Sequence, residues 1–493
     1  MKILLVYPQY PETFWSFRQA LKFISKKALL PPLGLLTIAT LMPEEYERKL
    51  IDMNVGKLTD KHLLWADYVF ISAMITQKES AVKVIERCRK LGVKTVAGGP
   101  LFTSMKENFS DVDHLVLDEG EITLPMFLED LKKGNLKKIY NSELKPDITK
   151  TPVPQWELIN HSNYSKMPLQ FSRGCPFYCE FCDIVNLNGR IPRTKSPDQI
   201  IREIEALRKV GWKYSIFIVD DNFIGDKKKT KELLRELIRW KENNKSRITF
   251  MTEVSLNIAD DDELLQLMRA AGFDGVFIGL ETPSRESLEE CGKFQNKNRD
   301  LISSVRKIQS YGMEVSGGFI VGFDSDDSSI FARQIEFIQK TGVVVAMIGL
   351  LQALPGTRLY ERLVRENRLL NSATGNNTDF SLNFLPKIDT DVLINGYKNI
   401  IESVYSPKQY YERIMTFLKH YNAYSCEPLD FKYIKALIRS IITIGIFHRE
   451  RFLYWKLFFT SLFIYPRAFS KAISMAVYYT HFRKIFMDMA KSS

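Results

Sequence analysis

The sequence predicts an α/β protein in three parts: a doubly wound parallel sheet over residues 1–135, a partial parallel barrel over residues 169–355, and a helical extension over residues 356–493. Within the first two parts, short apolar runs alternate with amphipathic segments, a pattern typical of parallel strands joined by helices. Residues 136–168 are polar, contain several prolines and lack a clear period, so we expect a linker there. After about Pro355 the strand-like runs stop, and helical spacing continues to the end of the sequence.

The first predicted strand is the apolar run at the start of the chain, "MKILLVYP". It is too short for a signal peptide and lacks a small-residue cleavage site. The runs "YVFISAM" and "KTVAGGP" predict further strands, with the amphipathic segment "SAVKVIERCRKLG" between them. Together these elements indicate a Rossmann-like domain.

Ligands of such a domain lie beyond the carboxyl ends of its strands, which places a predicted binding site around Ser72, Gly98 and Gly99. The two glycines either let a ligand approach the backbone or only shape a turn. The domain has no GxGxxG fingerprint, which argues against a nicotinamide dinucleotide.

Six apolar runs in the second part predict the strands of a (β/α)6 barrel, and amphipathic segments such as "SPDQIIREIEALRKVG" separate them. These runs are "LQFSR", "YSIFIVDD", "RITFMTEVS", "GVFIGLE", "VSGGFIVGF" and "VAMIGLLQAL". Parallel barrels carry their chemistry at the carboxyl ends of the strands. The polar residues that end these runs are therefore the first candidates for a site.

The loop after the first of these strands, "RGCPFYCEFC", contains three cysteines, Cys175, Cys179 and Cys182. The other three, Cys88, Cys291 and Cys426, stand alone, so the chain has no disulfide framework and a reducing cytoplasm is expected. A structural zinc site needs four ligands, and His161 is the nearest candidate for the fourth. The alternative is a cubane iron-sulfur cluster, in which three thiolates leave one iron free for a small molecule.

The spacing C-x3-C-x2-C, with Phe181 just before the last cysteine, resembles that of the radical S-adenosylmethionine enzymes. The resemblance implies a 4Fe-4S cluster held by the three cysteines. It implies that the open iron binds S-adenosylmethionine and that one-electron reduction releases a 5'-deoxyadenosyl radical. It also implies an external electron donor such as flavodoxin or ferredoxin.

Further positions match the cofactor-binding elements of that family. After the second strand, Asp220, Asp221 and Asn222 stand where the family accepts hydrogen bonds from the methionyl ammonium, and carboxylates suit a cationic amine. Their alternative role is an ordinary cap of the following helix. By the same resemblance, Glu253 and Glu281, which end later strands, bind ribose hydroxyls or the ammonium.

Two weaker signals accompany these carboxylates. Gly318, Ile320 and Gly322 in "GGFIVGF" resemble the adenine-side motif GxIxGxxE, although the glutamate is missing and Asp324 stands nearby. Arg193, together with Arg190 and Lys195, follows the cysteine loop. These cations either lie beside a bound carboxylate or phosphate or are solvated.

A Rossmann-like domain in front of such a barrel resembles the cobalamin-binding subgroup, through "PPLGLLTIATLM", "AGGP" and "LDEGE". The helical extension resembles the branch that contains the hopanoid methylases. The resemblance implies cobalamin and a C-methyltransferase that acts on an unactivated carbon of a lipid-like or secondary-metabolite substrate. The alternative within the subgroup is a cyclase, oxidase or rearrangement enzyme without methyl transfer.

One feature departs from the subgroup's histidine-ligated members. Residues 1–135 contain no DxHxxG motif, and His62 and His114 lack its surroundings, so no lower axial cobalt ligand is offered. Cobalamin then binds without a protein histidine, or the domain is only a scaffold.

The last 64 residues, Asp430 to Ser493, carry eleven Lys or Arg against three Asp or Glu, together with fifteen aromatic residues. No run of about 18 apolar residues, the length that spans a bilayer, occurs there. We expect peripheral contact with the inner face of a membrane, or else helices that pack on the main domain with solvated cations. Although the pI is about 9.1, the chain has no recognisable nucleic-acid motif, and a nucleic-acid partner is not expected.

Overall fold

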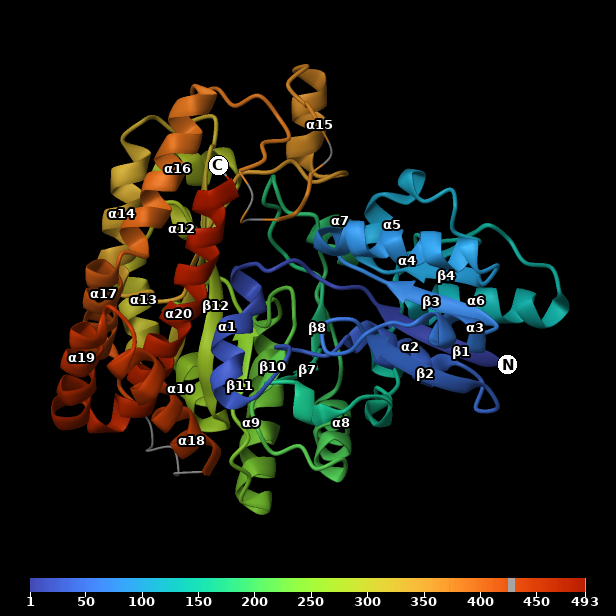
Figure 1. The fold of residues 1–493 in the computed structure, drawn as a ribbon, viewed down its shortest axis with the longest axis horizontal. Helices are drawn as coiled ribbons and strands as arrows, with labels where there is room; N and C mark the ends of the chain where they lie inside the picture. The colour runs from blue at the N-terminus through green and yellow to red at the C-terminus, as the bar shows by residue number, and fades with distance from the viewer. Residues whose placement is uncertain (372, 377, 379, 424–430, 493) are drawn as a thin grey trace.

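The computed structural model describes residues 1–371, 373–376, 378, 380–423 and 431–492, so Cys426 lies outside the described residues. Two α/β bodies lie side by side, and the C-terminal helices pack against the side of the second body that faces away from the first (Figure 1). The three predicted parts are therefore present.

The first body is a six-stranded parallel sheet with the order β2-β1-β3-β4-β5-β6. Helices cover both of its faces, as expected for a doubly wound domain: the apolar residues of α2 and α6 pack on one face and those of α3 to α5 on the other. The strands are β1 (Lys2–Tyr7), β2 (Glu47–Asp52), β3 (Tyr68–Ser72), β4 (Lys94–Gly98), β5 (His114–Val116) and β6 (Ile139–Tyr140). The helices are α2 (Leu33–Leu41), α3 (Asp60–Trp65), α4 (Lys78–Lys90), α5 (Pro100–Ser104) and α6 (Gly120–Lys133).

The strand β6 lies inside the predicted linker. It pairs with β5 and extends the first sheet by one strand. The rest of residues 136–168 has no α-helix and contains short 3-10 turns such as Trp156–Leu158, as a linker without a regular apolar period would.

The second body is also a six-stranded parallel sheet, and its strands follow one another in chain order. They are β7 (Met167–Leu169), β10 (Ile216–Ile218), β11 (Phe250–Glu253), β12 (Phe273–Glu281), β13 (Glu314–Val321) and β14 (Ala346–Leu350). The connecting helices include α8 (Pro197–Lys209), α9 (Lys227–Asn244), α10 (Asp262–Ala271), α13 (Leu301–Ser310) and α14 (Ile330–Thr341). Because β7 and β14 do not pair, the barrel is partial, as predicted.

The remaining chain is helical. Its elements are α15 (Arg358–Arg365), α16 (Thr390–Val404), α17 (Pro407–His420), α18 (Phe431–Ser440), the π-helical turn η9 (Ile441–Ile446), α19 (Arg451–Ile464) and α20 (Phe469–Ser492). No helix in the described part of the chain has both the length and the apolar character needed to cross a membrane.

The open side of the barrel is covered by two segments that lie at opposite ends of the sequence. After β1 the chain leaves the first sheet and forms η1 (Phe14–Ser16), α1 (Arg18–Leu21) and η2 (Lys22–Ile24), which pack beside α20. The ring of Phe14 stacks 6.0 Å from that of Tyr405, whose hydroxyl bonds the Ala346 carbonyl in β14. Further along, Ala28 pairs with Tyr164 just before β7.

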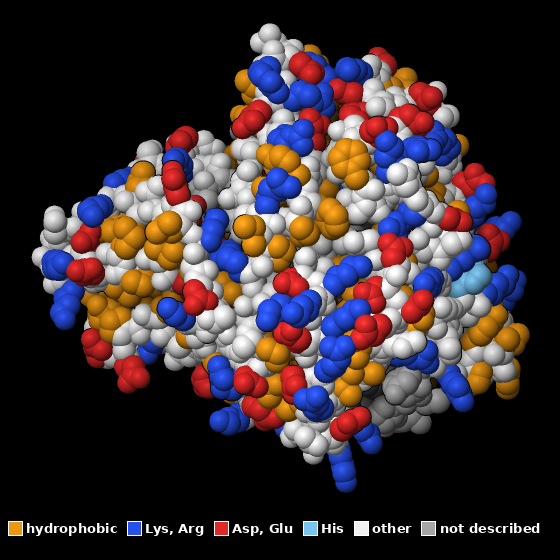
Figure 2. Space-filling view, turned by 180° about the vertical axis from the view of Figure 1, so that it is seen from behind, with side chains coloured by type: hydrophobic (Ala, Val, Ile, Leu, Met, Phe, Trp, Pro, Cys, Tyr) orange, Lys and Arg blue, Asp and Glu red, His pale blue; other side chains and the backbone are white. Residues whose placement is uncertain are grey.

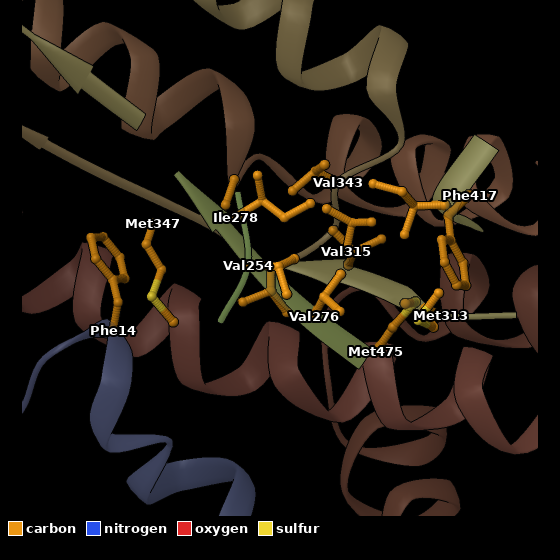
Figure 3. Packing of buried hydrophobic residues seen from close by; sticks show 14 of the residues in the cluster. Phe14, Val254, Val276, Ile278, Met313, Val315, Val343, Met347, Phe417 and Met475 are labelled. Carbon is orange, nitrogen blue, oxygen red and sulfur yellow. The ribbon is translucent and has the colours of Figure 1, made fainter. Parts of the chain in front are cut away.

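Figure 3 shows Phe14 from this segment and Met475 from α20 beside the strand residues Val276 and Met347. The N-terminal segment and α20 therefore pack beside barrel strands that include β12 and β14.

Candidate active site at the cysteine loop

The cysteine loop is closed by a short antiparallel pair, β8 (Ser172–Arg173) and β9 (Arg193–Thr194). The predicted strand "LQFSR" is thus split, because its first part pairs in the barrel as β7 and its last two residues turn into β8. Gly174 has φ +97°, and a Cβ there would lie 2.9 Å from the carbonyl oxygen of Ile191. Only glycine fits where the loop returns on itself.

Two carboxylates of the "VDDN" sequence hold this loop in place. Asp220, 1% exposed, accepts hydrogen bonds from Phe171 N (2.7 Å), Ser172 N (2.8 Å) and Ser172 Oγ (2.7 Å). Asp221 accepts from Gly174 N (2.7 Å) and Asn188 Nδ2 (2.9 Å). Burial raises the pKa of Asp220 to about 7. Both carboxylates therefore lie against the loop, and a bond from either to a methionyl ammonium remains a prediction.

The three thiols of the loop are neighbours and carry no disulfide. Burial raises the pKa of Cys175, Cys179 and Cys182. A metal group bound by their thiolates must offset this cost of deprotonation. Among the described residues, no three His, Cys, Asp or Glu side chains converge on the position of a single metal ion. The ring of His161 contacts the Trp156 carbonyl instead, so no Cys3His set forms here. Three neighbouring thiols on one loop fit a cluster that is larger than an ion.

Asn222 and Glu253 stand at the barrel side of the loop. The Nδ2 of Asn222 lies 4.0 Å from Cys175 Sγ and 3.2 Å from Ser255 Oγ. Glu253 ends β11, and its side chain has no hydrogen-bond or ion-pair partner among the described residues. Burial, followed by the charges of Asp221 and Asp220, raises its pKa to about 8. This unpaired carboxyl is the group most available to a cationic ligand.

Glu281 lies on the other side of the loop and is paired with a residue that sequence reasoning missed. Its Oε1 is 2.7 Å from Lys293 Nζ, and both side chains are nearly buried. The φ of Glu281 is +62°, where the pairing of β12 with β13 changes register. Lys293 follows Cys291 in "ECGKF", and its charge lowers the pKa of Cys179 against the effect of burial. Only the position of Lys293 after the predicted fourth strand could have signalled it.

The glycine-rich strand β13 contributes Gly318 and Ile320, and Gly322 follows with φ +103°. A Cβ on Gly318 would lie 3.2 Å from the ring of Phe277. The turn at Gly322 is held by Asp326, which accepts from Gly322 N (2.9 Å). The carboxylate of Asp324 is bound by Arg362 (2.7 Å) and Arg368 (2.6 Å), which keep its pKa well below the usual range.

Phe181 is partly buried against the small core cluster that contains Cys291 and Phe323. Its ring lies 6.3 Å from that of Phe323, so it ties the last cysteine of the loop to the end of β13.

An ion-pair network joins the two bodies at the cysteine loop. Arg173 binds Glu119 (2.7 Å) and Glu121 (2.7 Å) at the start of α6, and Arg193 binds Glu119 (2.8 Å). All four side chains are at most 19% exposed. The "LDEGE" sequence therefore anchors the first domain to the cysteine loop, and Arg193 takes part in this anchor.

The other two cations of the predicted group lie apart. Lys195 forms a buried pair with Glu203 (2.5 Å), and Arg190 lies over the ring of Tyr178, with its Cζ 4.9 Å from the ring centroid.

The carboxyl ends of β3 and β4 bring Ser72, Gly98 and Gly99 together. A Cβ on Gly98 would lie 2.4 Å from the Val116 carbonyl, and one on Gly99, whose φ is +88°, 2.5 Å from Ser72 Oγ. Both glycines are required by this turn, whatever binds beside it.

A cavity of about 350 Å³ lies next to this edge. Its lining includes Thr103 and Asp118 from the first domain, Lys145 from the linker and Asn186 from α7 (Ile184–Asn188), directly after the cysteines. The carboxyl edge of the first sheet thus lies beside the helix that follows the cysteine loop, and ligand binding at this edge remains a prediction. The two histidines of the first domain that lack the cobalt-ligand motif have partners within the domain: His62 accepts from Thr59 N (3.2 Å), and His114 contacts the Lys137 carbonyl (2.6 Å).

Three family models match separate parts of the chain. Residues 24–128 match the B12 binding domain, residues 169–338 the radical SAM superfamily, and residues 357–493 a domain of unknown function, DUF4070.

Two curated relatives span nearly the whole chain. An uncharacterized methyltransferase of Synechocystis is 42% identical over 98% of this chain and 91% of its own length. The hopanoid C-2 methylase of Rhodopseudomonas palustris is 33% identical over 92% of this chain and 88% of its own length.

Solved structures share the fold at low identity. The cobalamin-dependent S-adenosylmethionine radical enzyme OxsB has a TM-score of 0.64 at 16% identity, covering 100% of this chain and 80% of its own. The radical S-adenosylmethionine methyltransferase TsrM of Kitasatospora setae has a TM-score of 0.58 at 16% identity, over 76% of this chain and 79% of its own.

Proposed function

The chain belongs to the cobalamin-dependent radical S-adenosylmethionine methyltransferases, and we propose that it methylates an unactivated carbon of a lipid-like small molecule. The support from relatives is the hopanoid C-2 methylase, which matches the helical extension as well as the two cofactor domains.

The structural observation that carries the substrate class is an apolar wall on the inner face of the barrel. The ring of Trp15, from the N-terminal segment, lies 4.7 Å from the half-buried ring of Phe277 on β12. Gly318 on β13 leaves Phe277 room, and Ile320 is also half-buried. An apolar wall with few polar groups suits a hydrocarbon substrate and excludes water from the site.

The residues of the chain have distinct tasks in this proposal. Cys175, Cys179 and Cys182 would hold the 4Fe-4S cluster by their thiolates. When bound, the cluster, S-adenosylmethionine and cobalamin supply the radical and the methyl group. Glu253 and Asn222 would orient the cationic end of S-adenosylmethionine. The ion pair of Glu281 and Lys293 would hold the side of the site that lies beside Cys179. The ion pairs of Arg173 and Arg193 would hold the two cofactor domains in a fixed position relative to each other.

An external electron donor is part of this proposal, and an exposed surface beside the cysteine loop supports it. Tyr178, between two of the cysteines, is 41% exposed. The guanidinium carbons of Arg190 and Arg358 lie 4.9 Å and 4.8 Å from its ring centroid. Neither arginine has a carboxylate partner among the described residues, so the surface suits a small acidic carrier such as flavodoxin.

Arg190→Glu with Arg358→Glu should slow reduction by such a carrier and spare reduction by dithionite. Equal rates with both reductants, relative to the parent protein, would contradict this docking site.

We place the protein in the cytoplasm, with peripheral membrane contact through the C-terminal extension. The basic and aromatic composition of residues 430–493 supports this placement.

The test of the function is turnover by anaerobically purified protein that has been reconstituted with iron, sulfide and cobalamin. With dithionite as the reductant, S-adenosylmethionine labelled in its methyl group and a polycyclic terpenoid lipid extract, we expect label in a lipid product, together with 5'-deoxyadenosine and S-adenosylhomocysteine. Cys182→Ser should abolish all three products, whereas Cys88→Ser, a buried cysteine in the first domain, should not. 5'-Deoxyadenosine without S-adenosylhomocysteine would indicate radical chemistry of another kind, such as a cyclase or oxidase.

A further inference from the structure

Two exposed apolar stripes run along the hairpin of α18, η9 and α19. On α18 and η9, four isoleucines spaced by four residues are each 38% to 51% exposed: Ile434, Ile438, Ile442 and Ile446. On α19, Phe452, Phe459 and Phe463 are 75%, 49% and 76% exposed. At about 100° per residue, these three phenylalanines lie on one face of the helix. Contiguous apolar surface of this kind marks an interaction site.

The hairpin is firmly packed on its other face, so the exposure is a property of the fold. Tyr454 and Leu457 of α19 are buried. The Trp455 indole donates to the Gly445 carbonyl (2.9 Å), and the hydroxyls of Ser440 and Tyr454 are 2.8 Å apart. The side chains that could be buried against the protein are therefore already buried.

The same hairpin is strongly basic. Residues 431–468 contain seven Lys or Arg and one acid, Glu450. Glu450 is 9% exposed and faces Arg483 at 3.6 Å. By contrast, Lys435, Arg451 and Lys456 are exposed and have no carboxylate partner in the part of the chain that the structure describes. Seen from behind, hydrophobic side chains lie among Lys and Arg at the edge of the molecule that α19 forms (right-hand edge of Figure 2).

We propose that this hairpin docks on the surface of a membrane that contains anionic lipids. Such a surface offers an apolar interior for the stripes and negative headgroups for the cations. A second copy of the chain fits worse, because a two-fold contact would set exposed cations such as Lys435, Arg451 and Lys456 against the same cations of the other copy. The docked hairpin would provide the peripheral membrane contact proposed above. Only the choice of the cytoplasmic leaflet rests on that earlier proposal.

The hairpin also touches the segment that covers the open side of the barrel. Arg439 Nη1 donates to the carbonyls of Lys22 (3.0 Å) and Phe23 (3.0 Å) and to Ser25 Oγ (2.8 Å). A membrane bound by the hairpin would therefore lie beside the cover of the barrel.

The experiment is flotation of the full chain, without substrate, on vesicles of phosphatidylcholine alone or with phosphatidylglycerol. We expect binding to the anionic vesicles and little to the neutral ones. The double variant Phe452→Ser, Phe463→Ser should weaken binding on the order of tenfold or more for each phenylalanine removed. Lys456→Glu should weaken it roughly fivefold or more. The matched control is Leu64→Ser with Leu144→Ser, which removes two similarly exposed leucines, 62% and 75%, from elsewhere on the surface.

Equal flotation of the phenylalanine double variant and the parent would overturn the proposal, as would a parent that binds neither vesicle. Concentration-dependent dimerisation that the double variant abolishes, without vesicle binding, would assign the stripes to a second copy and also overturn it. Flotation measures vesicle binding without turnover, whereas the proposed lipid methylation is tested by the labelled products. Loss of one result therefore does not imply loss of the other.

Discussion

Glu253 differs from the other carboxylates around the cysteine loop because it has no partner. Asp220 and Asp221 are satisfied by loop donors, and Glu281 by Lys293. A buried carboxyl without such bonds prefers its neutral form, which explains why its pKa is raised to about 8. A cationic ligand beside it would reverse this preference.

The pH dependence of unfolding tests this environment. Between about pH 5 and about pH 8, folded apoprotein keeps a proton on Glu253 that the unfolded chain has released, so stability falls as the pH rises. In Glu253→Gln this contribution is absent. We expect the melting temperature of the variant to fall less than that of the parent from about pH 6 to about pH 8.5. Glu129→Gln, on exposed α6 surface, should follow the parent, and an unchanged slope for Glu253→Gln would contradict the burial argument.

Asp220 should matter for metal loading through the loop that it holds. Asp220→Ala leaves the N–H groups of Phe171 and Ser172 buried without an acceptor, at about 1–3 kcal/mol each. We expect lower iron and sulfide content after reconstitution and a lower melting temperature.

The control for Asp220 is Asp226→Ala. Asp226 only caps α9 through Lys229 N (3.1 Å), so its loss should cost about 1 kcal/mol and leave the iron content unchanged. Full iron loading by Asp220→Ala would show that the loop closes without its anchor.

At the scale of elements, the start of α6 is fastened to the cysteine loop by partly buried ion pairs. Removing one partner of such a pair leaves the other charge uncompensated, which costs roughly 3–5 kcal/mol, far more than the loss of an exposed pair. The contact between the two domains should therefore depend on Arg173.

We expect Arg173→Met to lower the melting temperature and to increase tryptic cleavage within residues 141–166. Adding Glu121→Met should restore much of the loss, because the stranded carboxylate is then removed. Arg89→Met breaks an ion pair with Asp111 in which both side chains are about 60% exposed, and should change little. If the double variant is as unstable as the single one, the pairs do not act as a unit.

The sheets were predictable because their apolar runs are short and regularly separated. The two parallel sheets, the partial barrel and the position of the cysteine loop follow from that pattern, whereas the strand order of the first sheet does not. What could not be predicted depends on contacts between distant residues. Asp324 is bound by Arg362 from α15 and by Arg368 from the turn after it. Lys293 pairs with Glu281, which lies twelve residues earlier in the chain.

The same limit applies to the N-terminal cover of the barrel. Residues 14–24 are only short turns of helix with weak periodicity, and their place is set by aromatic contacts to α20, more than 450 residues away.

At the scale of the whole molecule, the two ends of the chain close the barrel together. Phe482 of α20 is fully buried and its ring lies 6.0 Å from Phe14, 5.8 Å from Phe17 and 5.0 Å from Tyr405. Next to it, His481 Nε2 bonds the carbonyl of Thr13 (3.1 Å), and burial lowers the pKa of His481 to about 4, so the ring is neutral and donates this bond. The cover is therefore held by α20 rather than by the barrel strands alone.

Phe482→Ala should release this cover selectively. The lost packing costs about 3–5 kcal/mol, and because the ring contacts residues of the N-terminal segment, the loss falls on that segment first. We expect faster amide hydrogen exchange in residues 11–28 with little change in β10 to β13. Phe250→Ala, equally buried but in β11, should instead raise exchange in the barrel strands and leave residues 11–28 protected. Equal protection of residues 11–28 in parent and Phe482→Ala would mean that the segment is held by its contacts with Tyr164 and Asn163, and that α20 is not what keeps the barrel closed.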